Sequence, residues 1–146
     1  MIVIASDHAG VDLKAQIVEL VREAGYDARD LGPTDTASVD YPDFGHDVAT
    51  AIATGEARTG ILICGTGIGM SMTANRHPGV RAALCHDAFT AEMARRHNDA
   101  NVLCVGARVV GFGVAEQMVR IFLGTEFEGD RHQRRVNKIE ISQEDS

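Results

Sequence analysis

The chain has 146 residues, of which 45% are hydrophobic and 24% are charged, which suits one folded domain over residues 1–146. Fourteen Lys and Arg against 21 Asp and Glu give a net charge of −7, which argues against a nucleic-acid partner. No apolar run approaches the length of a membrane span, and residues 1–6 lack the basic stretch of a signal peptide. The odd number of cysteines, all in or beside apolar runs, favours reduced thiols and a cytoplasmic protein.

Two hydrophobic periods alternate along the chain. Short apolar runs predict strands at 2–5, 60–64, 80–85 and 101–105. A weaker run mixed with charges, 26–31, predicts a strand near an edge of the sheet. Apolar residues at helical spacing predict helices between them, at 11–24, 44–55, 70–76, 87–97, 114–124 and from 131. This alternation predicts an α/β fold: a three-layer, doubly wound sheet of five buried, mainly parallel strands with helices on both faces.

Ligands of such sheets bind beyond the carboxyl ends of the strands. That rule directs attention to four segments that follow predicted strands. They are Asp7-His8, the segment from Cys64 to Gly69, His86-Asp87, and the segment from Gly106 to Arg108.

Three alternating glycines follow the third strand, in Gly65-Thr66-Gly67-Ile68-Gly69. Glycine lets successive backbone N–H groups approach a ligand, and the helix that follows adds its positive end, so the loop is predicted to hold an anion. The alternatives are a tight turn without a ligand, or dinucleotide binding. Met70 stands where the dinucleotide fingerprint needs its last glycine, although Asp87 could imitate the ribose-binding acid.

Cys64 stands at the junction of strand and loop, where a thiol can become a usable thiolate. On position alone, a functional role and an inert one are equally open. Thr66 could bond the thiol or a substrate oxygen, or serve only the turn. Cys85 and Cys104, inside apolar runs, are interpreted as inert filling.

The histidines carry weaker signals. His8 is a polar contact at a strand end or a surface residue, and His97 is best explained as closing its helix. His46 and His77 have no chemical context and are expected to be solvated. No His or Cys spacing indicates a metal site.

A basic segment, Arg131-His132-Gln133-Arg134-Arg135, stands out in this acidic chain. Arg131 and Arg135 are four residues apart and project from one helix face, which suits a phosphate, whereas Arg134 would point elsewhere.

Together these motifs resemble those of ribose-5-phosphate isomerase type B, within the group that includes galactose-6-phosphate isomerase subunits. The resemblance covers nearly the whole chain. It rests on residues 6–10, 40–42, 60–69, 96–99, 106–111 and 131–135.

The resemblance implies a metal-free, cofactor-free aldose–ketose isomerase that acts on ribose 5-phosphate and ribulose 5-phosphate. Cys64 would be the base, Thr66 would assist it, and His97 would open the furanose ring. Asp7 and Asn98 would bind sugar hydroxyls, the loop from Gly65 to Gly69 would bind sugar oxygens, and the phosphate would contact His8, Arg131 and Arg135. It also implies a homodimer, with a dimer of dimers as the larger alternative, and a site between subunits.

Some family members use a Glu one turn later in the glycine loop instead of the Cys. Met70 occupies that place here, so Cys64 alone is left as the base. Arg76, His77 and the stretch from Cys85 to Asp87 depart from the family pattern, which leaves open an isomerase of tetrose 4-phosphates or hexose 6-phosphates. A non-catalytic sugar-phosphate or nucleotide-binding module is the third hypothesis.

Overall fold

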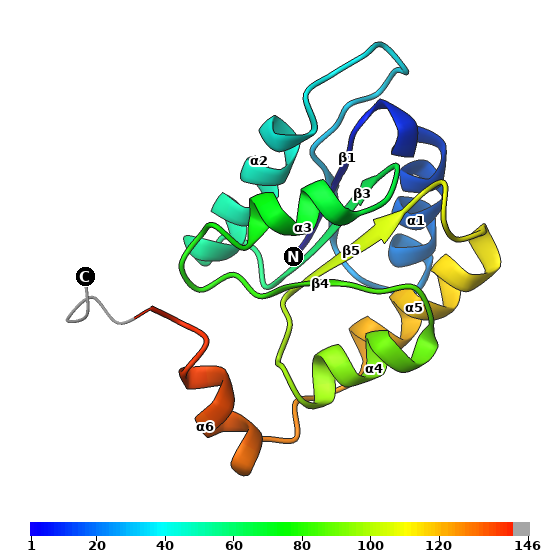
Figure 1. The fold of residues 1–146 in the computed structure, drawn as a ribbon. Coiled ribbons are helices and arrows are strands. Elements are labelled where there is room, and N and C mark those ends of the chain that lie inside the picture. The colour runs from blue at the N-terminus through cyan, green and yellow to red at the C-terminus, as the bar shows by residue number, and fades with distance from the viewer. Residues whose placement is uncertain (142–146) are drawn as a thin grey trace.

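Residues 1–141 of the computed structural model form a five-stranded sheet with helices on both faces (Figure 1). Residues 142–146, the end of the predicted domain, lie outside the described residues. The strands are β1 (Ile2–Ser6), β2 (Ala28–Asp30), β3 (Thr59–Cys64), β4 (Ala82–Leu84) and β5 (Val102–Gly106). The helices are the 3₁₀ turn η1 (His8–Gly10), α1 (Val11–Glu23), α2 (Tyr41–Ala53), α3 (Ile68–Ala74), α4 (Ala88–Arg96), α5 (Phe112–Gly124) and α6 (Arg131–Asn137).

All neighbouring strands pair in parallel, in the order β2-β1-β3-β5-β4. The chain leaves β1 toward one edge to form β2, then crosses back to place β3 on the other side of β1. The strand order therefore reverses between β1 and β3, which is where open α/β sheets form their ligand crevice.

Two hydrophobic cores confirm the three layers. Helices α1, α4 and α5 pack on one face of the sheet, and α2 and α3 pack on the other (Figure 1). The central strands β1, β3 and β5 alternate their side chains between both cores, which explains their continuous apolar runs. α6 stands apart from the sheet, beyond the end of α4 (Figure 1).

The edges differ in how well the sequence predicts them. β2 lies at an edge, as its mixed composition indicates, and only Ala28 of the strand is buried. The prediction of a buried fourth strand over 80–85 is wrong in extent, because β4 spans Ala82–Leu84 at the opposite edge and is half-buried. With β5 on one side only, β4 lacks the neighbour that would cover it.

None of the helices within residues 1–141 is long and apolar enough to cross a membrane.

Candidate active site

Asp7 and Cys64 meet where the strand order reverses. Asp7 directly follows β1, Cys64 ends β3, and the Asp7 N–H donates to the Ile63 carbonyl oxygen at 3.0 Å. The Asp7 side chain is buried, and its Oδ1 accepts N–H bonds from Ala9 at 2.9 Å and Gly10 at 3.1 Å. The carboxylate is thereby fixed as the cap of η1 at the edge of the crevice.

Cys64 is 5% exposed, and its Sγ accepts the Gly67 N–H at 3.1 Å. This bond fixes the sulfur against the glycine loop. The other two cysteines are buried in the hydrophobic cores. Burial raises the pKa of Cys85 to about 11 and raises the pKa of Cys104 still further, which agrees with their interpretation as inert filling.

The glycine loop lies directly against the end of β5. Gly67 has a φ of +80°, and a Cβ there would come within 2.6 Å of Leu84 and 3.0 Å of the Val105 carbonyl carbon. A Cβ on Gly106 would lie 2.7 Å from the Thr66 carbonyl oxygen. These two glycines are therefore required by packing, whatever the loop binds.

Two of the loop's N–H groups are already used within the loop. Gly67 donates to Cys64 Sγ, and Ile68 donates to Thr66 Oγ1 at 3.2 Å. The Thr66 hydroxyl thus serves the turn in this structure, although its residue is exposed at the crevice. An anion would have to use the remaining N–H groups of the loop.

Two neighbours of the loop, Arg108 and Tyr41, have no role that the sequence patterns assign. The Arg108 guanidinium would lie 3.4 Å from a Cβ on Gly65. The backbone N–H of Arg108 donates to the Gly65 carbonyl oxygen at 3.0 Å. The Tyr41 ring would lie 2.6 Å from a Cβ on Gly69. The strand-end rule marks the segment containing Arg108, whereas Tyr41 begins α2, and no local pattern shows that the start of this helix packs against the glycine loop.

His8 and Asp87 have structural partners. His8 Nδ1 accepts the Val39 N–H at 3.2 Å, which ties the long loop before α2 to the end of β1. Asp87 caps α4, and its Oδ1 accepts the Thr90 N–H at 2.7 Å, a bond that lowers the pKa of the carboxyl. Capping of α4 explains the presence of Asp87 at this position without a bound dinucleotide.

The remaining predicted site residues lie at the other end of the strands, at the amino edge of the sheet. His97 is the C-cap of α4, which runs against the strands, and Asn98 follows it shortly before β5 begins. Arg131 and Arg135 are exposed on α6. β5 has five residues at about 3.3 Å each, so roughly 16 Å of strand separates this amino-edge group from Cys64 and the glycine loop. One chain does not bring all predicted residues together.

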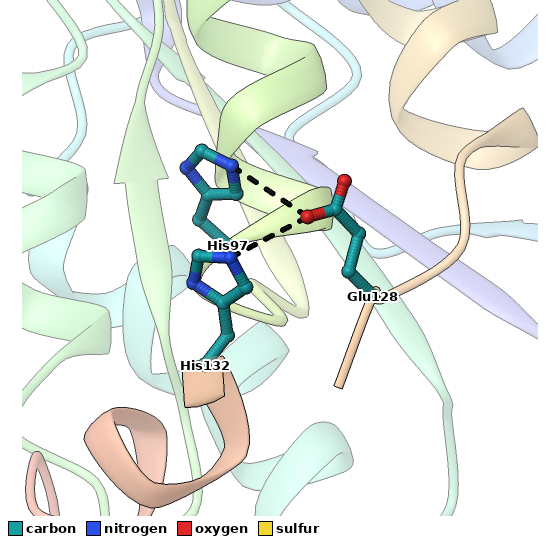
Figure 2. Close-up of side chains that lie close together, drawn as sticks. All are labelled: His97, Glu128 and His132. Carbon is teal, nitrogen blue, oxygen red and sulfur yellow. Dashed lines mark ion pairs between the residues drawn. The ribbon is translucent and has the colours of Figure 1, made fainter. Parts of the chain in front are cut away.

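His97 and His132 stack at the amino edge, with ring centroids 4.3 Å apart and planes inclined by 10° (Figure 2). Glu128 Oε1 lies 3.8 Å from His97 Nε2 and 3.4 Å from His132 Nε2. Burial, followed by the proximity of His97, lowers the pKa of His132. The sequence shows only Glu128 and His132 four residues apart, because His97 comes from another helix.

His46 and His77 also have a context that the sequence does not reveal. His46 Nδ1 lies 2.7 Å from His77 Nε2, which joins α2 to the turn after α3. Partial burial, and then the charge of His46, lower the pKa of His77. Both residues are at least partly exposed, as predicted, but each ring has a partner, so the expectation that they lack a chemical context is wrong.

Comparisons with known proteins agree on a family. The family described as Ribose/Galactose Isomerase matches residues 2–139. Ribose-5-phosphate isomerase B of Escherichia coli is 46% identical, over 91% of this chain and 89% of the relative. D-erythrulose-4-phosphate isomerase of Pectobacterium atrosepticum is 41% identical, over 94% of this chain and 91% of the relative. The solved structure of Clostridium thermocellum ribose-5-phosphate isomerase B superposes with a TM-score of 0.93 at 50% identity, covering 94% and 93% of the two chains.

Proposed function

The chain belongs to the ribose/galactose isomerase family, and from that premise we propose that it interconverts ribose 5-phosphate and ribulose 5-phosphate. The observation that carries the proposal is the buried Cys64, whose Sγ accepts the Gly67 N–H at the point where the strand order reverses. A binding module needs no such base. The similarity to ribose-5-phosphate isomerase B of Escherichia coli supports the choice of sugar.

Isomerisation moves a proton between C1 and C2 of the open-chain sugar through an enediolate. The Cys64 thiolate takes the C2 proton of the aldose and returns it to C1, while a hydroxyl proton moves from O2 to O1. Thr66 assists the base. Removal of such a weakly acidic proton needs a positioned base together with donors at the developing oxyanion. Unused N–H groups of the glycine loop supply those donors, and Asp7 binds a sugar hydroxyl.

The other half of the site would come from a second copy of the chain. His97 would open the furanose ring, Asn98 would bind a hydroxyl, and Arg131 and Arg135 would bind the phosphate together with His8. The separation of these groups by the length of β5 supports a homodimer in which the amino edge of one subunit faces the glycine loop of the other.

Mixed dimers test this arrangement. Cys64→Ser and His97→Asn should each be inactive on ribose 5-phosphate. If the site is shared, randomly mixed dimers of the two should regain about a quarter of wild-type activity, since half are heterodimers and each has one intact site of two. If Cys64 and His97 act within one chain, no activity should return.

A second candidate function is isomerisation of another sugar phosphate, a tetrose 4-phosphate or a hexose 6-phosphate. The similarity to D-erythrulose-4-phosphate isomerase favours the tetrose. His86 and Asp87 are exposed at the carboxyl end of β4, where they could limit sugar length. Values of kcat/KM for a panel of phosphosugars decide between these substrates. Deuterium uptake from solvent at C1 or C2 separates any isomerase from a non-catalytic binder.

A further inference from the structure

Three metal-ligating side chains converge at the amino edge, a strand's length from the glycine loop of the same chain. His97, Glu128 and His132 each offer a donor atom, and these atoms lie within 4.8 Å of one another (Figure 2). We propose that the three residues bind a divalent transition metal such as Zn²⁺, and that the bound ion takes His97 out of sugar-ring opening. The proposed inhibition through His97 rests on the proposed function, whereas the proposed metal binding does not.

His132 provides the strongest indication of a ligand. Its residue is 5% exposed, and its Nε2 is buried without a hydrogen-bond partner among residues 1–141. That atom lies 3.4 Å from Glu128 Oε1, yet the two atoms are not aligned as a hydrogen bond (Figure 2). A buried polar atom left unpaired costs free energy, which a metal between nitrogen and carboxylate would recover.

Glu128 presents its two oxygens to different neighbours. Oε2 accepts a bond from Arg96 Nη1 at 3.4 Å, whereas Oε1 faces both imidazoles. Arg96, Arg131 and Arg135 make the surroundings positive, which disfavours a hard cation held by charge alone. Two imidazoles and one carboxylate instead match the ligand preference of Zn²⁺ or Co²⁺, with a fourth position open.

Metal binding requires one ring to tilt. The imidazole planes are nearly parallel, so the two Nε2 lone pairs run side by side instead of converging. Zn²⁺ at its usual bond lengths holds tetrahedral donors roughly 3.4 Å apart. His97 can tilt, because its side chain is 41% exposed at the end of α4. His132, a residue of α6, is buried and less free to move.

A metal on Nε2 of His97 would remove a nitrogen needed for proton transfer to the sugar ring. Inhibition should therefore depend on the substrate. Conversion of ribose 5-phosphate, which closes to a furanose, should be inhibited, and conversion of an open-chain tetrose 4-phosphate should be affected much less.

The binding test uses untagged, metal-stripped full-length protein carrying Cys64→Ser, which removes a competing thiolate. Co²⁺ is titrated while its visible ligand-field bands are recorded, and Zn²⁺ competition is measured by calorimetry. We expect one Co²⁺ per chain, with affinity at least about tenfold weaker in His132→Asn and in Glu128→Gln. His77→Asn, from the other histidine pair, is the matched control and should bind normally. Glu128 is exposed, so its variant remains informative if His132→Asn fails to fold.

Unchanged Co²⁺ binding in a folded His132→Asn or Glu128→Gln, or loss of binding in His77→Asn, would overturn the site. The inhibition test measures Zn²⁺ against ribose 5-phosphate turnover with Cys64 intact. Equal inhibition of the wild type and Glu128→Gln would refute the effect on His97. Stoichiometric Co²⁺ binding by the Cys64→Ser protein, together with a wild-type chain that isomerises no phosphosugar, would refute the proposed function and leave the metal site standing.

Discussion

Replacing His97 by Asn separates a helix cap from a ring-opening residue. In the folded chain the His97 side chain makes one long ion-pair contact, 3.8 Å to Glu128, and stacks on His132. Both partners of that ion pair are about two-fifths exposed, so the contact adds little stability. The substitution should lower the free energy of unfolding by at most about 1 kcal/mol, which thermal unfolding can measure.

The expected loss of activity is much larger and depends on the sugar. Ribose 5-phosphate closes to a furanose and must be opened before its C2 proton becomes acidic, and general acid–base catalysis contributes about 10²–10⁴-fold. Ribulose 5-phosphate cannot close such a ring, because the oxygen that would attack C2 carries the phosphate. The variant should therefore lose turnover of ribose 5-phosphate yet retain solvent-deuterium exchange at C1 of ribulose 5-phosphate.

The assay follows both readouts by NMR and coupled spectrophotometry, with His77→Asn as a control that removes a histidine elsewhere. Equal losses of turnover and of C1 exchange would show that His97 serves proton transfer or the fold. The ring-opening assignment would then be withdrawn. An unimpaired variant would leave His97 as a cap only.

Three further predictions follow from the geometry. Cys64→Ser should abolish isomerisation and C1 exchange while phosphosugar binding by calorimetry survives, because a hydroxyl is far less acidic than a thiol; turnover near the wild-type rate would disprove the base. Gly106→Ala should lower the free energy of unfolding by about 1–3 kcal/mol in denaturant titrations, because the new Cβ would lie 2.7 Å from the Thr66 backbone. Gly113→Ala, with open space around it, is the matched control. Asp130→Gly should raise stability by about 1 kcal/mol, because Asp130 holds φ +50° and ψ −127°, a conformation that glycine adopts without strain; a lower melting temperature would contradict this.

The sequence by itself determines the layers and the loop of the candidate site. Local periodicity distinguishes the buried strands β1, β3 and β5 from the amphipathic helices between them, because each pattern reflects the burial of its own segment. The strand-end rule then places Asp7 and Cys64 at one edge of the sheet, where the structure has them.

The tertiary structure alone decides which distant residues meet. The stack of His97 on His132, the Arg108 guanidinium beside Gly65 and the pairing of His46 with His77 join segments far apart in the chain. No local pattern encodes such contacts, because they depend on how helices and loops pack across the sheet. For the same reason, only the direction of α4 against the strands shows that His97 lies a strand's length from Cys64 in one chain, which is the separation that supports the proposed homodimer.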